Sequence, residues 1–272
     1  MFESVCCYVT NACNVACDYC FRLDSENKYM NIETFKKVLN KLKEIGCKRL
    51  AITGGEPTLH PNIKEMINLA YDSGFYVDLL TNGILVDLDD PIYQKISIIC
   101  LSLDGVTDIG NQHREKVQTE STKKIIEQYK SKDYPFAIKV SSVVTHSNYK
   151  EMVELGKNVL NDKRIIWRLF KCRTYGDYNK LDTKELLNQE ELQELINDIE
   201  NNSFECKVYL KGLIDEIKEV SKHVLINTNG DLYINEYFIG NLLQDNIKDL
   251  EEKCKCYYTD NYKSDILVKW RK

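Results

Sequence analysis

The sequence predicts an α/β fold, in which a partial, TIM-like (β/α)6 barrel is followed by a C-terminal α+β extension. Short runs rich in β-branched residues alternate with segments whose apolar residues recur at helical spacing. Such alternation favours a parallel sheet covered by helices. The alternation stops near residue 171, where a polar stretch begins. We therefore expect the barrel to occupy residues 1–178 and the extension to occupy residues 179–272.

Composition limits the class of protein. Of the 272 residues, 43% are hydrophobic and 29% are charged, which is typical of a folded globular chain rather than a disordered one. A net charge of −5 argues against a broad nucleic-acid-binding or anionic-membrane surface. The longest apolar run, 96–103, is too short to cross a bilayer, and the first residues lack the pattern of a secretion signal. We therefore expect a cytoplasmic protein with no membrane partner.

The barrel is expected to contain six strands, each followed by a turn or a helix. The expected strands are residues 5–10, 49–53, 76–80, 96–103, 137–144 and 165–170, and the expected helices are 32–42, 63–70, 121–130 and 148–160. Gly46 and Gly74 resemble C-terminal caps of the first two helices. The carboxyl ends of parallel barrel strands meet at one face, so we expect functional residues to gather there.

The extension is expected to contain one amphipathic helix and one hairpin. Leu192, Leu195 and Ile199 recur at helical spacing, whereas Asn229 and Gly230 indicate a tight turn between two strands. This change of pattern separates the extension from the βα repeat before it.

The eleven cysteines give the clearest chemical signal. Grouping at short spacings fits metal or cluster chemistry in a reducing compartment better than a disulfide framework. Cys13, Cys17 and Cys20 form a C-x-x-x-C-x-x-C array just after the first strand. Four thiolates usually hold a four-iron cluster, so three leave one iron open to an outside ligand. The alternative is a structural zinc or a closed cluster completed by Cys47 or Cys172.

Three further motifs stand at successive strand ends. They are Gly54, Gly55, Glu56 and Pro57 after the second strand, Thr81 and Asn82 after the third, and Ser102 and Asp104 after the fourth. Each alone is common turn chemistry. Glycines permit a close backbone approach, and an acidic side chain can complement an ammonium group. Their occurrence together, in order and each at an expected strand end, is improbable by chance.

Taken together, these motifs resemble the radical S-adenosylmethionine (SAM) superfamily over about residues 5–171. The cysteine array, with Tyr19 and Phe21 around its last cysteine, is similar to the cluster loop of that family. The resemblance implies a [4Fe–4S] cluster on the three cysteines and SAM as the second cofactor. It places the strand-end motifs beside SAM, with Ser102 at the ribose or methionine, Arg114 at the carboxylate, and Ser141 on the fifth strand.

The resemblance also implies the reaction. SAM would chelate the open iron, and the reduced cluster would cleave it to methionine and a 5′-deoxyadenosyl radical, which abstracts a hydrogen from the substrate. The electron would come from a donor such as flavodoxin or ferredoxin. The protein would orient the substrate and exclude competing hydrogen donors, so no catalytic side chain is expected beyond the cluster and SAM site.

Two basic residues indicate the class of substrate. The strands that carry Lys139 and Arg168 resemble those of the viperin branch, whose members dehydrate nucleotides, and both side chains would point into the barrel mouth. They would bind a phosphate or carboxylate of a polar small molecule or nucleotide; solvated strand positions are the alternative. The segment CLSLDG is closer to peptide-modifying and cofactor-maturing branches, so a ribosomal peptide is the second candidate substrate.

The extension resembles a shortened SPASM or twitch domain around residues 227–242. Those domains often house auxiliary clusters, with a cysteine soon after the hairpin, but the matching stretch DLYINEYFIGN contains none. Cys254 and Cys256 could still hold metal together with Cys172 or Cys206, and ordinary free thiols are the alternative. A non-catalytic iron-sulfur or zinc protein is the hypothesis of another class.

Overall fold

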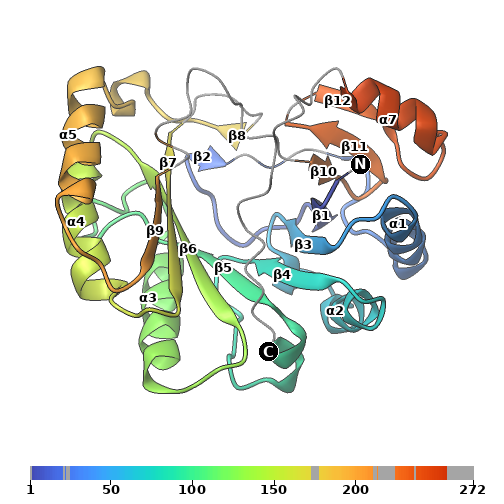
Figure 1. Cartoon of the computed structure of the whole chain (residues 1–272), viewed down its shortest axis with the longest axis horizontal. Helices are drawn as coiled ribbons and strands as arrows, with labels where there is room; N and C mark the ends of the chain where they lie inside the picture. The colour runs from blue at the N-terminus through green and yellow to red at the C-terminus, as the bar shows by residue number, and fades with distance from the viewer. Residues whose placement is uncertain are drawn as a thin grey trace.

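A ten-stranded, curved sheet with helices outside it forms the protein in the computed structural model (Figure 1). The structure describes residues 2–20, 22, 25–172, 178–210, 213, 224–235 and 237–255. The strand order is β12-β11-β10-β1-β3-β4-β5-β6-β7-β9. The expected fold class is confirmed, because this is a mixed α/β fold with a largely parallel sheet.

The middle of the sheet consists of the six expected barrel strands. They are β1 (Ser4–Thr10), β3 (Arg49–Gly54), β4 (Tyr76–Leu80), β5 (Ile98–Ser102), β6 (Ala137–Val144) and β7 (Ile165–Lys171). Each pairs in parallel with the next. Their carboxyl ends therefore meet at one face, where the strand-end motifs gather.

Helices connect these strands along the outside of the sheet. The longer ones are α1 (Ile32–Glu44), α2 (Ile63–Asp72), α3 (Lys116–Ser131), α5 (Gln189–Glu200) and α7 (Ile247–Lys255), and short 3₁₀ segments are η1 (Pro57–Leu59), η2 (Pro91–Lys95) and η5 (Thr183–Glu185). The helix expected at 121–130 begins five residues earlier, because Gln118 and Thr119 already face the core.

The helix expected at 148–160 is irregular. It runs through a 3₁₀ turn, η3 (Tyr149–Glu151), one α turn, α4 (Met152–Glu154), and a π turn, η4 (Leu155–Val159). Within the π turn, a Cβ added to Gly156 would lie 2.6 Å from the Phe204 ring. The segment therefore packs too closely against its neighbour for a larger residue at that position.

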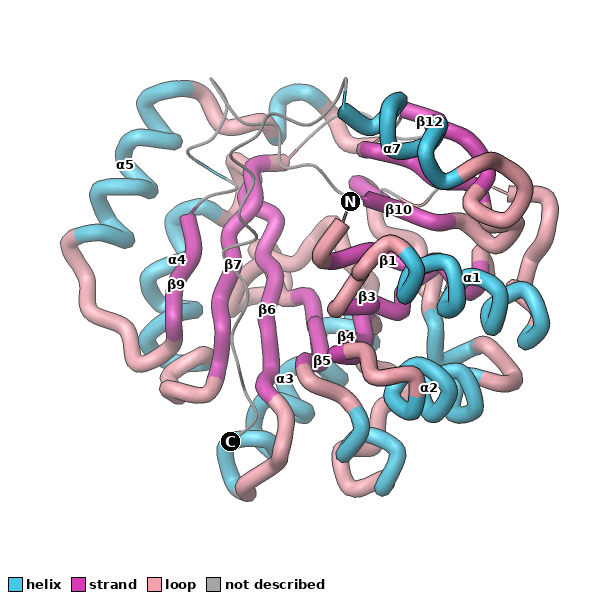
Figure 2. The backbone as a smooth tube through the Cα atoms, turned by 45° about the vertical axis from the view of Figure 1, so that its right-hand side comes forward, coloured by secondary structure: helices cyan, strands magenta, loops and turns pink. Residues whose placement is uncertain are grey.

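The extension lengthens the barrel sheet at both edges. β9 (Lys207–Leu210) pairs with β7, while β10 (Val224–Ile226) pairs with β1 and continues into β11 (Asp231–Ile234) and β12 (Tyr237–Asn241). Gly230 forms the expected tight turn with a φ of 87°. Figure 2 shows this hairpin and α7 beyond β1 and α1. The segment after residue 178 is thus continuous with the barrel sheet.

The two faces of the strands carry different side chains. On β6 and β7, Ile138, Val140 and Trp167 belong to the main core that packs against the helices. Lys139 and Arg168 alternate with them, so they face the concave side of the sheet. The concave side also has a small apolar cluster around Ile98, Cys100, Ala137 and Ile166.

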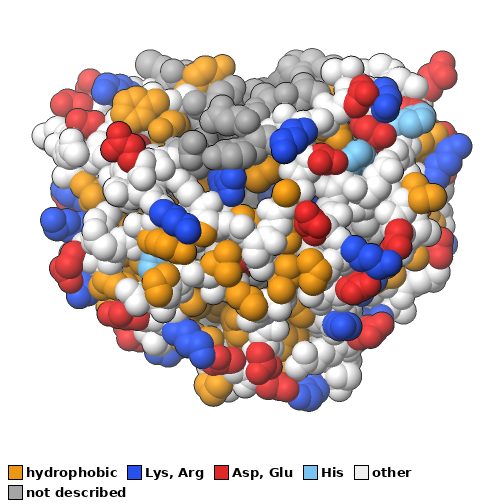
Figure 3. All heavy atoms as spheres, turned by 180° about the vertical axis from the view of Figure 1, so that it is seen from behind, with side chains coloured by type: hydrophobic (Ala, Val, Ile, Leu, Met, Phe, Trp, Pro, Cys, Tyr) orange, Lys and Arg blue, Asp and Glu red, His pale blue; other side chains and the backbone are white. Residues whose placement is uncertain are grey.

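The surface has the mixed charge expected of the composition. Acidic and basic side chains are interspersed on the face shown in Figure 3. Among the described residues, no helix is long and apolar enough to span a bilayer.

A buried ion pair, Arg49 with Asp78, lies on the concave side at the start of β3 and β4. The Nη1–Oδ1 distance is 2.6 Å, and the side chains are 7% and 5% exposed. Because removal of one partner leaves an unpaired buried charge, we expect Arg49→Met to lower the free energy of unfolding by about 3–5 kcal/mol. Urea unfolding measures this change. The double variant Arg49→Met/Asp78→Leu is the control and should cost less than either single variant; an equal or larger cost would contradict the argument.

Candidate functional site

The cysteine array begins in the loop at the carboxyl end of β1, which holds Cys13 and Cys17, and ends with Cys20 in the short strand β2 (Tyr19–Cys20). Cys13, Cys17 and Cys20 are free thiols, each half-buried. β2 pairs with β8 (Tyr178–Asn179), which follows the barrel. The loop is therefore held from both ends, by the barrel strand before it and by β8 after it.

The three thiols lie within electrostatic reach of one another. Burial raises the pKa of Cys13, and the nearby thiol of Cys20 raises it further. Burial likewise raises the pKa of Cys17, Arg114 opposes that rise, and both Cys20 and Cys13 add to it. Within the described part of the chain, no three Cys, His, Asp or Glu side chains are gathered tightly enough for one metal ion. The thiols share one site but are not arranged around a single ion.

The donor set suits an iron-sulfur cluster. Thiolates are the ligands by which proteins hold such clusters, and three of them leave an iron position open. The half-buried setting excludes part of the solvent without closing the site. These residues therefore fit the group that the sequence implies.

The glycines at the end of β3, Gly54 and Gly55, allow close contact with the loop that carries the cysteine array. The Gly55 amide donates to Thr10 O at 2.7 Å, and the Glu56 amide donates to Ala12 O at 2.7 Å. A Cβ on Gly54 would lie 2.2 Å from Thr10 O, and one on Gly55 would lie 2.3 Å from Ala12 O. Only glycine permits this approach, so the motif fixes the start of the loop.

The Glu56 carboxylate, which is expected to complement an ammonium group, is buried in the structure, and the residue is 0% exposed. It accepts hydrogen bonds from the Asn82 amide at 2.6 Å, the Thr81 hydroxyl at 2.7 Å, and the Thr58 amide and hydroxyl. The carboxylate therefore joins the ends of β3 and β4, and its contact with a ligand stays a prediction. Pro57, also buried, begins η1.

Asn82 connects the third strand end to the cysteine array. Its Nδ2 donates to the Oδ1 atom of Asn14 at 2.7 Å, and Asn14 lies between Cys13 and Cys17 in the sequence. Thr81 turns its hydroxyl to Glu56 and accepts from the Gly83 amide. The second and third strand ends thus both support the cluster loop.

Asp104 is the centre of a buried polar network. It accepts from the Tyr19 hydroxyl, from Arg114 through Nε and Nη2, and from the Val143 amide at 2.8 Å. The Arg114 guanidinium also lies over the Tyr19 ring, 5.1 Å from its centroid. Burial and Asp104 raise the pKa of Tyr19, although Arg114 opposes that rise, so its hydroxyl stays protonated.

The network engages three residues that are expected to border SAM. Arg114, expected at the SAM carboxylate, pairs with Asp104, and its side chain is 7% exposed; its contact with SAM stays a prediction. Burial disfavours the charge, but Asp104, Tyr19 and Cys17 together outweigh burial and raise the pKa of Arg114. Tyr19 and Asp104 are likewise turned into the protein. Through these hydrogen bonds the three residues hold the cysteine loop against the ends of β5 and β6.

Ser102, Ser141 and Arg168 form a row across three strands. Ser102 is opposite Ser141, and Ser141 is opposite Arg168. All three are half-buried on the concave face; Ser102 ends β5, whereas Ser141 and Arg168 lie in the middle of β6 and β7. One step earlier along the strands, Lys139 is opposite Cys100. The structure therefore brings together the two basic residues and the two serines that the sequence singled out.

Lys139 keeps its charge in this setting. Burial favours the neutral amine, but the neighbouring Cys100 and Asp78 outweigh that effect and raise the pKa. Arg168 opposes the rise, which shows that its guanidinium is within electrostatic reach. The concave face therefore presents two cations close together.

Sequence reasoning missed several residues that position the loop. His113 binds Asp18 Oδ2 at 2.9 Å through Nδ1, and its Nε2 lies 3.4 Å from Glu185. Ser25 contacts the Thr228 hydroxyl at 2.5 Å, which joins the loop to the hairpin of the extension. Such contacts join positions far apart in the chain, and no local pattern marks them.

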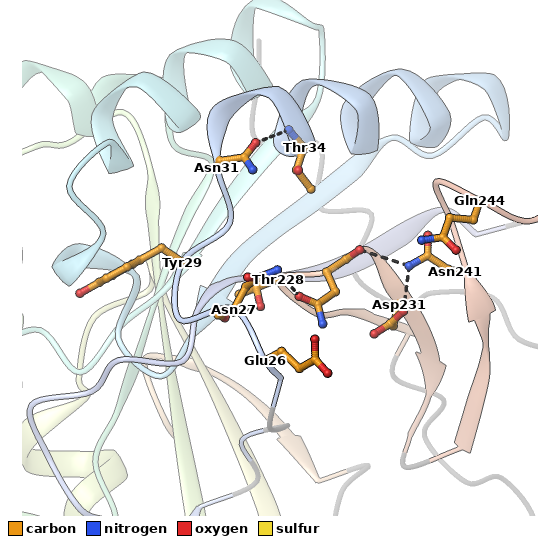
Figure 4. Close-up of a pocket in the computed structure, with 10 residues that line it drawn as sticks. Glu26, Asn27, Tyr29, Asn31, Thr34, Thr228, Asp231, Asn241 and Gln244 are labelled. Carbon is orange, nitrogen blue, oxygen red and sulfur yellow. Dashed lines mark hydrogen bonds between the residues drawn. The ribbon is translucent and has the colours of Figure 1, made fainter.

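A separate polar pocket of about 390 Å³ lies between the residues before α1 and the hairpin (Figure 4). Glu26, Asn27 and Asn31 line it on one side, and Asp231 and Asn241 line it on the other. Asn241 donates to Asp231 at 2.8 Å. This hydrogen bond joins two strands of the hairpin. The predicted site residues do not line this pocket.

The late cysteines are core residues where they are described. Cys254 is 3% exposed on α7, and Cys172 and Cys206 are also buried. Burial raises the pKa of Cys254 to about 11. Cys256, as well as Phe21 of the expected cofactor site, lies outside the described residues.

The curved parallel sheet and the three-cysteine loop at its carboxyl edge define a class of enzyme. The sequence model of the radical SAM superfamily matches residues 7–159, and the chain belongs to that family. It is therefore a radical SAM enzyme, and the family implies a [4Fe–4S] cluster and SAM.

Two relatives and one solved structure show what this chain is similar to. An S-adenosylmethionine-dependent nucleotide dehydratase of Flammeovirga pacifica is 28% identical over 222 residues, covering 75% of this chain and 74% of the relative. The enzyme of the same name from Selenomonas ruminantium is 26% identical over 180 residues, covering 62% and 65%. Streptococcus suis SuiB bound to SAM has a similar fold, with a TM-score of 0.71 and 17% identity, covering 95% of this chain and 66% of SuiB. This chain thus spans just under two thirds of the Selenomonas relative and of SuiB.

Proposed function

We propose that this radical SAM enzyme acts on a nucleotide or a similar polar small molecule, whose anionic group binds Lys139 and Arg168. One observation carries the proposal: both cations face the concave side of the barrel, close to each other. The 28% identity to a nucleotide dehydratase supports the same substrate class. A phosphate can accept hydrogen bonds from the Lys139 ammonium and, through two N–H groups, from the Arg168 guanidinium.

The cofactors would occupy the carboxyl edge of the strands. Cys13, Cys17 and Cys20 would hold the cluster, and the residues at the ends of β3, β4 and β5 would border SAM. When bound, these two groups would supply a 5′-deoxyadenosyl radical, with the electron taken from a flavodoxin or ferredoxin. The chain's own task is to hold the substrate near SAM and to limit solvent access.

The half-buried row on the concave face suits that task. Ser102 and Ser141 face each other on β5 and β6, next to Arg168 on β7, and their hydroxyls can donate to or accept from a sugar or from SAM. Cys100, beside Lys139, is 6% exposed. Burial raises the pKa of Cys100, and the neighbouring Lys139 opposes that rise.

Replacing either cation tests the substrate class. We expect Lys139→Met or Arg168→Met to leave substrate-independent 5′-deoxyadenosine formation largely intact, because both residues lie on β6 and β7, outside the three-cysteine array. Substrate-dependent turnover should fall by roughly 10-fold or more when a charged hydrogen bond of ~1.5–3 kcal/mol is lost. Methionine keeps the apolar stem while removing the charge. The measurement is 5′-deoxyadenosine release with and without a panel of nucleoside triphosphates.

Lys64→Met is the matched control, since Lys64 is 67% exposed on α2 and should change neither reaction. Equal losses with and without nucleotide would assign the two cations to the SAM site. If no nucleotide stimulates the wild-type enzyme but a peptide does, a peptide substrate replaces this proposal. SuiB, which has also been solved bound to its precursor peptide SuiA, shares the fold with this chain.

A further inference from the structure

Two polar side chains flank the sulfur of Cys17. Arg114 Nη1 lies 3.9 Å from Cys17 Sγ, and Gln118 Oε1 lies 3.6 Å from it. Gln118 is 2% exposed, in the first turn of α3. A buried carboxamide requires hydrogen-bond partners, and the Cys17 sulfur is one of them. The helix therefore presents a buried amide to one particular cysteine of the array.

The direction of this hydrogen bond must change when Cys17 binds iron. As a free thiol, Cys17 donates its S–H to the carboxamide oxygen of Gln118. A thiolate that holds iron has no proton to donate, and the oxygen would then face an electron-rich sulfur. Rotation of the carboxamide by half a turn exchanges its oxygen and nitrogen in nearly the same space. The Nε2–H group then points to the sulfur.

We infer that Gln118 is a positioning residue, which donates an N–H···S hydrogen bond to the Cys17 thiolate and raises the reduction potential of the cluster. Hydrogen bonds to cluster sulfurs stabilise the more negative, reduced form. The inference rests on the proposed assignment of the cluster to Cys13, Cys17 and Cys20. It adds a residue outside the cysteine loop to the groups that control the electron transfer.

The effect on Cys17 can be tested by substituting Gln118 but not by substituting Arg114. Arg114 also faces Cys17, but it is paired with the buried Asp104, so its removal would leave an uncompensated charge. Gln118 is neutral, and leucine or methionine has a similar volume without an N–H donor. One turn further along the same face of α3, Thr122 is 0% exposed, and its hydroxyl has no hydrogen-bond partner among the described residues.

The experiment is a redox titration of the reconstituted holoenzyme without SAM, followed by electron paramagnetic resonance. We expect Gln118→Leu and Gln118→Met to retain about four irons per chain. Their equilibrium constant for one-electron reduction should fall roughly 10-fold, a shift of about 60 mV to more negative potential. Thr122→Val, the matched control, should titrate like the wild type.

An unchanged potential in either Gln118 variant with its iron retained would overturn the inference, and so would an equal shift in Thr122→Val. A second measurement needs no variant. In wild-type enzyme labelled with ¹⁵N in glutamine side chains, pulsed electron paramagnetic resonance should detect a nitrogen coupled to the reduced cluster; lack of that coupling would also overturn it. A wild-type protein that assembles no cluster would instead contradict the cluster assignment.

Discussion

Replacement of Cys13, Cys17 and Cys20 together by alanine is expected to abolish both cluster binding and SAM cleavage. These thiols form the array that the sequence and the loop geometry point to, and their removal leaves the iron without protein ligands. The wild-type protein should contain about four irons per chain after anaerobic reconstitution. Iron quantification and 5′-deoxyadenosine release measure the two effects. The fold should survive, because the three side chains are half-buried in a loop rather than part of the core.

Cys254→Ala is the control for this result. Its thiol is buried on α7, so its loss should lower stability while leaving about four irons. A triple variant that still cleaved SAM would refute the assignment of the cluster. Wild-type protein with roughly eight irons, returning to about four in a Cys254→Ala/Cys256→Ala variant, would reveal a second cluster at the late cysteines.

The barrel was predictable because its signals are local. β-branched runs and helical spacing depend on neighbours in the chain, and they located the six barrel strands and α1, α2 and α5. The irregular segment at 149–159 was not predictable, because the close contact of Gly156 with Phe204 joins distant positions. The same reason hid the placement of β9 and β10, whose short strands join opposite edges of the sheet.

The site was predictable in its residues more than in its contacts. The strand-end motifs do lie around the cysteine loop, as their order indicated. The sequence did not reveal that the Glu56 and Asp104 carboxylates accept hydrogen bonds from other residues of the protein, since several of those donors come from other strands. A buried carboxylate is stable only when it is paired or hydrogen-bonded. The assignment of individual residues to SAM remains a prediction.

One physical picture unites these contacts. Glu56 joins β3 to β4, Asp104 joins β5 to β6, and both are fully buried or nearly so. Asn82 and Tyr19 then extend these two centres to the cysteine loop. The residues at the strand ends thus hold the cysteine loop in place, which suits a site that must keep its reactants in a fixed orientation.

Gly55→Ala is expected to displace the cysteine loop and to remove most of the bound iron. The new methyl group would lie 2.3 Å from Ala12 O and 2.7 Å from Ala12 C. Both contacts are with backbone, so no side-chain rotation can relieve them. The hydrogen bonds from Gly55 to Thr10 and from Glu56 to Ala12 would lengthen or break, at a cost of about 1–3 kcal/mol from overpacking. Iron per chain and 5′-deoxyadenosine release should both fall by roughly 10-fold or more, because a loss of 1.4 kcal/mol is already tenfold.

Gly74→Ala separates this clash from the general cost of replacing glycine. Gly74 has a φ of 89°, but no atom lies within 4 Å of its added Cβ. Its replacement should therefore lower the free energy of unfolding by roughly 1 kcal/mol while iron content and SAM cleavage stay at wild-type levels. Normal iron binding in Gly55→Ala would mean that the loop moves aside without loss, and the close approach of the second strand end would then have no part in holding the cluster.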